Sequence, residues 1–192
     1  LGRKDMPILR DPEIPGGAHL LVTESTYGDR THPPLEQMED ELAALVRRVS
    51  ERGGKIVIPS FALERAQEIV YALGRLRREQ RIPAIPVYVD SPLTVKVTEI
   101  FERHPECFDT EARALLRGAS SPFDFEGLQY VSEVEASKAI DAAPEPAVII
   151  SASGMCEAGR VLHHLAATVA DARNAVVIVG FQAEHTLGRR IV

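Results

Sequence analysis

The sequence predicts an α/β fold, in which a mostly parallel β-sheet carries helices on both of its faces. Short runs of valine and isoleucine, such as residues 55–58 and 148–150, alternate along the chain with longer segments in which apolar residues recur every three or four positions. Strands that are apolar throughout are typical of parallel sheets buried on both sides, because a sheet with one solvated face alternates apolar and polar residues. Helices between such strands indicate connections that cross over the sheet.

The first half of the chain predicts a helix, a strand, a second helix and a second strand. Leucine, methionine and valine recur on one face of residues 35–49, and the Gly53-Gly54 pair ends that helix. Residues 55–58 form the first strand, and the apolar positions of residues 62–76 again follow helical spacing. A second strand follows at residues 85–89.

The second half continues the alternation with shorter segments. Ser91-Pro92 suits the start of a helix, since serine caps and proline is tolerated in the first turn. Residues 118–127 are polar and glycine-bounded, and we expect them to be the loosest loop of the chain. The elements expected here are helices over 93–103 and 110–116, strands over 128–131 and 148–150, a helix through 161–165, and a strand over 176–179.

A carboxylate stands at the end of one further apolar run, ahead of these elements. Leu20-Leu21-Val22 has the composition of a strand that delivers Glu24 at its carboxyl end. The glycine-broken loop that follows adds Ser25, Thr26, Tyr27 and Arg30. Ligands of open α/β sheets bind outside the carboxyl ends of the strands, so Glu24 is a candidate site residue, with metal binding as one candidate role. A strand that ends in a solvated acid and a turn fits the spacing equally well.

Polar or glycine-rich residues follow four of the predicted strands. They are Ser60 and Arg65, then Asp90 and Ser91, then Ser151 to Gly154, and finally Gly180, Gln182, His185 and Thr186. Serine, aspartate and glycine often do no more than cap helices and make turns, and for any one loop that interpretation is favoured. Because the carboxyl ends of parallel strands meet at one edge, four such loops together favour a binding cleft. The amides of Ser153-Gly154-Met155, ahead of a helix, could cradle a phosphate.

The overall charge excludes a protein coated in basic surface. The chain has 192 residues and a formal net charge of −6, which still permits a local groove lined by arginines such as Arg65, Arg160 and Arg189. The two cysteines, Cys107 and Cys156, have no ligand-like spacing. No apolar run has membrane-spanning length and no signal peptide opens the chain, so we expect a cytoplasmic protein without a membrane partner.

Histidines offer one candidate and one exclusion. His163 and His164 are adjacent in a predicted helix and point about 100° apart, so they do not easily bind one metal ion; we expect one to be packed and one exposed. His185, in a loop beside Gln182, is the better functional candidate. No Ser-His-Asp arrangement can be assigned, and no G-x-G-x-x-G segment follows a strand.

Both ends of the sequence look interrupted. The chain opens on Leu1-Gly2-Arg3 without methionine and stops at Ile191-Val192 without a polar tail, so we expect it to be a piece of a longer protein.

Several separated segments together resemble the β-CASP family of metallo-β-lactamase-fold nucleases, in its RNA-processing branch. That branch includes bacterial and archaeal homologues of the cleavage subunit of the polyadenylation machinery. Any one segment is a weak signal, whereas the set covers nearly the whole chain and is highly specific. The segments are Thr23-Glu24-Ser25-Thr26-Tyr27-Gly28, residues 58–68 (IPSFALERAQE), residues 88–93 (YVDSPL), Ser153-Gly154-Met155, residues 159–165 (GRVLHHL), and Val179 to Arg189.

The resemblance implies a two-part, zinc-dependent ribonuclease. Residues 1–30 would belong to a metallo-β-lactamase core and its connection, and residues 31–192 would form a Rossmann-like β-CASP domain that grips RNA. Glu24 would support a histidine from a later segment, which protonates the leaving group. Two zinc ions in the core would activate the attacking hydroxide. The expected substrate contacts are Ser60, Arg65, Ser91, Ser153, Gly154, Arg160, Gln182 and His185.

The sequence departs from the family pattern at the metal site. The H-x-H-x-D-H motif and the later histidines that complete the site are absent. We therefore expect residues 1–192 to hold no zinc and to cleave nothing alone, and residues 1–15 to be poorly anchored. The expected partners are RNA and the missing core in cis, and a homodimer remains an open alternative. A second hypothesis is that the parent is a non-catalytic scaffold that binds RNA or protein; Glu24 favours the nuclease. The DNA-repair branch is a lesser alternative.

Overall fold

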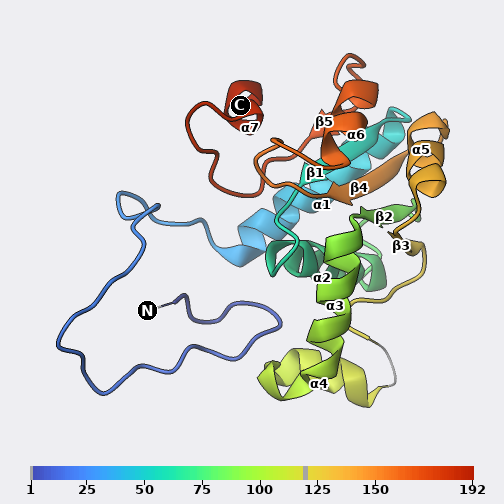
Figure 1. Ribbon diagram of the computed structural model, residues 1–192. Coiled ribbons are helices and arrows are strands. Elements are labelled where there is room, and N and C mark those ends of the chain that lie inside the picture. The colour runs from blue at the N-terminus through green and yellow to red at the C-terminus, as the bar shows by residue number, and fades with distance from the viewer. Residues whose placement is uncertain (1, 119–120) are drawn as a thin grey trace.

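The centre of the molecule is a parallel β-sheet, which the computed structural model places between helices on its two faces (Figure 1). The structure describes residues 2–118 and 121–192. Within them the sheet has five strands in the order β3-β2-β4-β1-β5, and all four pairings between neighbours are parallel. The strands are β1 (Lys55–Pro59), β2 (Val87–Asp90), β3 (Leu128–Val131), β4 (Ala147–Ser151) and β5 (Ala175–Val176). The predicted α/β fold is therefore confirmed.

The helices follow the predicted pattern, with some shifts at their ends. They are α1 (Leu35–Glu51), α2 (Arg65–Arg78), α3 (Pro92–Arg103), α4 (Thr110–Arg117), α5 (Val134–Ala142), α6 (Val161–Thr168) and α7 (Leu187–Ile191), with a 3₁₀ turn η1 (Pro105–Cys107). Helix α2 begins at Arg65 instead of residue 62, because Glu64 has a φ of 68° and breaks the helix there. Helices α5 and α7 were not predicted: α7 has only five residues, and α5 carries only Val134 and Ile140 as large apolar residues, so neither gives a clear apolar period.

Two hydrophobic cores cover the two faces of the sheet. Alternate residues of each central strand enter different cores: Ile56 and Ile58 face α1 and α2, whereas Val57 faces α5 and α6. On β4, Ile149 lies on the same side as Val57, and its two neighbours lie on the opposite side. This burial on both faces is the reason that these strands are continuous runs of valine and isoleucine.

The strand order creates a crevice at the carboxyl ends of β1 and β4. The connection from β1 passes over β4 to reach β2, and the connection from β4 passes over β1 to reach β5. Right-handed crossovers that run in opposite directions lie on opposite faces of the sheet. Helix α2 therefore covers one face and α6 covers the other. Two adjacent strands whose connections diverge form a topological switch point, which is where open α/β sheets bind ligands.

The N-terminal segment differs from the predictions in two ways. Residues 20–22 do not form a strand, and their three apolar side chains are exposed. Conversely, residues 7–10 are well anchored: Ile8 is 1% exposed in the first core, and its carbonyl accepts a hydrogen bond from the amide of Asp109 at 2.8 Å. The expectation of a loose N-terminus is therefore wrong for this stretch. The proposed boundary at residue 30 stays a prediction.

The predicted loose loop at residues 118–127 contains an anchor as well. Residues 119–120 fall outside the described part of the chain. Beyond them, Phe123 is fully buried, and its ring packs edge to face against Phe101 and Phe108, with ring centroids 5.8 and 6.0 Å apart. The end of the loop that carries Phe123 is therefore part of the core.

Replacing Ile8 with alanine is expected to lower the free energy of unfolding by about 2–5 kcal/mol, because the change deletes buried methyl groups and leaves a cavity. Ile14→Ala deletes the same atoms from a side chain that is 73% exposed. This control should change stability by no more than about 0.5 kcal/mol. Denaturant unfolding of the three proteins measures the difference, and equal losses for the two variants would contradict the anchoring of residues 7–10.

Candidate functional site

A pocket of about 350 Å³ opens at the carboxyl ends of β1 and β4. Four separate chain segments meet there. Its lining residues are Glu24, Thr26 and Tyr27, then Pro59, Ser60, Phe61 and Arg65, then Gly154 and Met155, and finally Val179, Gly180 and Phe181. Four of the predicted site residues, Glu24, Ser60, Arg65 and Gly154, are thus brought together at the topological switch point of the sheet.

The floor of the pocket depends on a close approach between two loops. The amide of Ser60 donates to the carbonyl of Ser151 at 3.0 Å and extends the pairing of β1 with β4 by one residue. A Cβ atom at Gly154 would lie 3.0 Å from the amide nitrogen of Phe61 and 3.1 Å from its ring. Both loops would have to separate to admit a side chain, so glycine at this position keeps the floor closed.

The C-terminal loop is tied to the loop after β4. The side-chain amide of Gln182 donates to the carbonyl of Gly154 at 2.9 Å, and the amide of Gly188 donates to the carbonyl of Met155 at 3.0 Å. A Cβ atom at Gly188 would lie 1.7 Å from Oε1 of Gln182. Gln182 is therefore buried next to the pocket, where it connects the two loops. His185 lies in the same loop but is exposed and does not line the pocket.

Ser91 and Ser153 hold backbone turns. The hydroxyl of Ser91 caps α3 by accepting from the amide of Thr94 at 3.3 Å. The hydroxyl of Ser153 accepts from the amide of Glu157 at 3.1 Å, and the Ser153 amide itself donates to the carbonyl of Ala158. The predicted phosphate cradle at residues 153–155 is not at a helix start, because α6 begins only at Val161.

Glu24 is solvent-exposed at the mouth of the pocket. Its carboxylate accepts a hydrogen bond from the backbone amide of Thr26 at 2.7 Å. That hydrogen bond lowers the pKa of Glu24 below its usual value. The side chain is thus an ionised, pre-oriented carboxylate, although it stands at the end of an extended segment and not of a strand.

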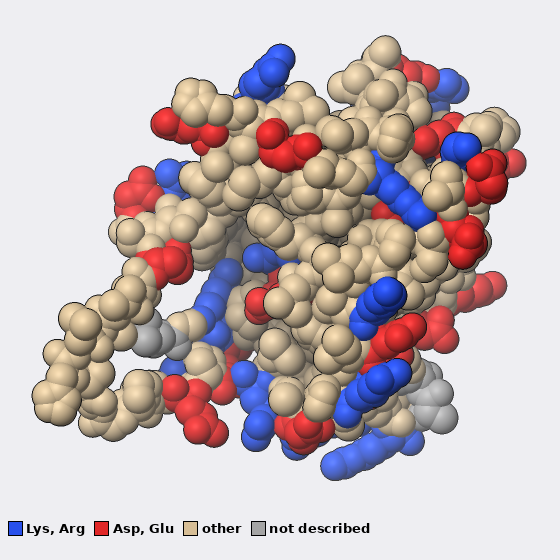
Figure 2. Space-filling model, in the orientation of Figure 1, with Lys and Arg blue, Asp and Glu red and all other residues tan. Residues whose placement is uncertain are grey.

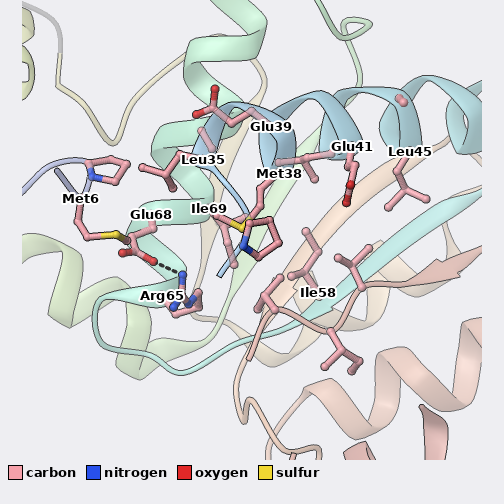
Figure 3. A pocket seen from close by; sticks show the side chains of 18 of the residues that line it. Met6, Leu35, Met38, Glu39, Glu41, Leu45, Ile58, Arg65, Glu68 and Ile69 are labelled. Atoms are coloured by element: carbon pink, nitrogen blue, oxygen red, sulfur yellow. Dashed lines mark hydrogen bonds and ion pairs between the residues drawn. The ribbon is translucent and has the colours of Figure 1, made fainter. Parts of the chain in front are cut away.

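Arg65 lies where the pocket meets a second and larger groove, of about 700 Å³. Figure 3 shows Arg65 and Glu68 facing each other at the end of this groove, below the apolar side chains of α1. The Arg65 side chain is 45% exposed, and its guanidinium pairs with the nearly buried carboxylate of Glu68. Burial raises the pKa of Glu68 above its usual value, against the attraction of Arg65. Part of the Arg65 charge is therefore balanced within the protein.

A buried charge network lies at the neighbouring strand β2. Asp90 is fully buried, and its two carboxylate oxygens lie 2.5 Å from a guanidinium nitrogen of Arg160 and 2.7 Å from Nε2 of His164. The hydroxyl of Ser137 donates to the same carboxylate. Nδ1 of His164 lies 2.6 Å from a carboxylate oxygen of Asp141. Arg160, a predicted substrate contact, is thus engaged inside the protein, and it also donates to the carbonyls at residues 131 and 132.

The network fixes the charge of His164. Burial alone disfavours the imidazolium, but hydrogen bonds to Asp90 and Asp141 raise the pKa of His164 above its ordinary value. Burial likewise disfavours the Asp90 carboxylate, while hydrogen bonds from His164, Ser137 and Arg160 lower its pKa. His163, the adjacent residue on α6, is exposed, as the helical spacing predicted.

Charge on the surface is mixed. Figure 2 shows acidic and basic side chains interspersed over the face in view. Among residues 2–118 and 121–192, no three histidine, cysteine or acidic side chains are grouped so that they could hold a metal ion. The described helices also include none long and apolar enough to cross a membrane.

The comparison with known proteins agrees with this architecture. A family model described as the Beta-Casp domain matches residues 66–191. The chain belongs to the β-CASP family. This membership confirms the resemblance noted in the sequence, and the β-CASP domain includes β2 to β5, helix α2 and the loop that carries Gln182 and His185.

Named relatives of the chain act on RNA or in transcription, according to their names. Ribonuclease TTHA0252 of Thermus thermophilus is 41% identical over all 192 residues. Transcription termination factor FttA of Methanosarcina mazei is 38% identical over 89% of the chain, and an RNase J-like protein of Methanocaldococcus jannaschii is 30% identical over 90%. The chain spans 44%, 27% and 39% of these curated relatives, respectively, which is less than half of each.

Replacing His164 with asparagine is expected to lower the free energy of unfolding by about 3–5 kcal/mol, because it removes the buried cation that pairs with Asp90 and with the part-buried Asp141. The raised pKa of His164 makes its contribution complete below its unfolded value of 6.5, and that contribution is lost as the pH rises through the folded pKa. The lowered pKa of Asp90 makes its contribution complete above 3.8, and that contribution is lost as the pH falls.

The stability difference between wild type and His164→Asn should therefore be largest between about pH 4 and 6.5 and smaller at alkaline pH. Denaturant unfolding across pH measures it. His163→Asn, on the exposed face of the same helix, is the control and should show little change. A difference that stays flat from pH 5 to pH 10 would contradict a charged His164.

Proposed function

We propose that this chain is the RNA-gripping part of a metal-dependent ribonuclease that acts in RNA processing or decay. The observation that carries the proposal is the pocket at the switch point, where an exposed arginine and an ionised carboxylate from distant segments meet beside the β-CASP loops that carry Gly154 and Phe181. The name of the Thermus thermophilus relative, a ribonuclease aligned with the whole chain, supports the same reaction class. Cytoplasmic location is part of the proposal.

In this proposal Arg65 attracts the phosphate backbone of RNA. A guanidinium at the rim of the pocket offers planar, bidentate recognition of phosphate oxygens. Ser60 and Gly154 form the pocket floor, against which the RNA backbone would lie. Gln182 holds its own loop to the loop that carries Gly154. His185 is a further proposed contact, because it is exposed in the loop next to the pocket. Ser91, Ser153 and Arg160 would act through the turns and the buried network that they stabilise.

The hydrolytic step would need groups that lie elsewhere in the parent protein. The two zinc ions implied by the family do not fit the described residues, which offer no cluster of three ligands. We propose that the ions belong to a metallo-β-lactamase core that pairs with this chain in cis, and that residues 1–192 bind RNA without cutting it. Glu24 would orient a histidine of that core, since a carboxylate beside an imidazole fixes its tautomer. A homodimer is a further proposed partnership.

Arg65→Ala is expected to weaken the binding of a single-stranded RNA and to reduce the salt slope of the affinity by about one phosphate contact. Arg78→Ala is the matched control, because Arg78 is exposed at the opposite end of the same helix and lies outside the pocket lining. Fluorescence anisotropy across a salt series measures both. Parallel salt slopes for wild type and Arg65→Ala would contradict a phosphate contact at Arg65.

Glu68→Gln should have the opposite effect on the same assay. The substitution removes the carboxylate that balances Arg65 while keeping a side chain of similar shape, so more of the guanidinium charge is available to RNA. We expect tighter binding and a steeper salt slope than in the wild type. Weaker binding with native stability would mean that Glu68 positions Arg65 instead of competing for it.

A further inference from the structure

Three aromatic side chains surround the pocket. Tyr27, Phe61 and Phe181 come from segments far apart in sequence and line the same cavity. The chain has only six phenylalanines, four tyrosines and no tryptophan. Three of these ten aromatic residues thus line one pocket, which is more than a random distribution over the chain would place there.

The two phenylalanines of the pocket are unlike the others in the chain. Phe108 and Phe123 are fully buried, and Phe101 and Phe125 pack against the first core. Phe61 and Phe181, in contrast, are 50% and 46% exposed. Burying a phenylalanine is ordinarily favourable by about 1.5–3 kcal/mol, so two half-exposed rings at one cavity point to a ligand or partner that covers them.

Two of the three rings are in contact with each other. Tyr27 and Phe181 meet edge to face, with ring centroids 6.3 Å apart and planes at 90°. In this arrangement each ring keeps at least one face that its neighbour does not cover. The loop that carries Phe61 lies in close contact with Gly154, since a Cβ atom at Gly154 would lie 3.1 Å from the Phe61 ring.

The positive charge of Arg65 beside these rings favours a flat ligand that also carries a negative charge. Arg65 lines the same pocket as Phe61 and Phe181, so a positive group and half-exposed aromatic rings lie together. Proteins that bind single-stranded nucleic acid combine these two features, since bases stack on aromatic rings while cations follow the backbone. A volume of about 350 Å³ is within the range of small-ligand sites.

We propose that Phe61 and Phe181 form a stacking platform for an unpaired nucleobase of the RNA whose phosphate lies at Arg65. The proposal rests on the proposed RNA binding and adds which part of the RNA is read. A base within a duplex already stacks on its neighbours, so the platform selects single-stranded RNA. Every base has a π face, so the selection tolerates sequence.

The test compares three variants of the full chain with a single-stranded RNA that carries 2-aminopurine at successive positions. Phe181→Leu and Phe61→Leu keep an apolar side chain without an aromatic face, and Phe181→Tyr keeps the ring. We expect quenching of the 2-aminopurine fluorescence in the wild-type complex at one position. Each leucine variant should lose that quenching and about 5- to 100-fold in affinity, and the tyrosine variant should retain both.

The salt slope separates stacking from charge. The leucine variants should bind more weakly with an unchanged slope, whereas Arg65→Ala changes the slope. Leu93→Ala, at an exposed apolar position on α3, is the control for a general loss of surface hydrophobicity. Thermal unfolding establishes that each variant is folded.

Wild-type RNA binding without quenching at any position, or leucine variants that bind as the wild type does, would overturn the platform and leave the proposed function intact. Preference for a duplex over the single strand would overturn the platform as well. No binding of RNA by the wild type would overturn both proposals.

Discussion

The parallel pairing of β1 with β4 is the contact on which the rest of the domain depends. These strands are separated in sequence by two others, yet they pair over five consecutive residues at the middle of the sheet. The connections after β1 and β4 run in opposite directions, so their helices lie on opposite faces of the sheet. A crevice therefore opens at the carboxyl ends of these two strands. Ser60 and Gly154 meet in that crevice because of strand order alone. The loops therefore only have to supply chemistry, since the position of the site is already set by the topology.

Polar groups at the carboxyl edge of the sheet are of two kinds: some are buried and paired within the protein, and others line the pocket. At β2, the buried Asp90 pairs with His164 and Arg160 and accepts a hydrogen bond from Ser137. These contacts connect β2 to α5 and α6. At β1 and β4, the polar groups and Arg65 face a cavity. A buried charge must have a partner, whereas an exposed arginine can exchange one anion for another. Exposure at the pocket, and not residue type, is what distinguishes Arg65 from Arg160.

Sequence patterns predicted the parts of the fold that depend on apolar periodicity. The runs at Ile56–Ile58 and Val148–Ile150 identify strands because burial on both faces leaves no room for polar residues. The same reasoning failed at Leu20–Val22, where a short apolar run lies exposed and unpaired. Proximity in sequence to a strand end predicted Arg65 and Gly154 at the pocket. It could not show that Arg160 turns inward. It named Tyr27 but missed Phe61 and Phe181, because the meeting of the three rings depends on segments that only the fold brings together.

The anchoring of Ile8 has a consequence for Glu24. Ile8 is fixed in the core and α1 is fixed from Leu35, while Arg3 contacts the carbonyl of Pro33 at 3.3 Å. The exposed stretch between these points is thus a loop tethered at both ends, and not a free arm. A double tether limits the volume that the loop can explore and raises the effective concentration of its residues at the surface they face. The two tethers, together with the contact between the rings of Tyr27 and Phe181, therefore keep Glu24 near the mouth of the pocket.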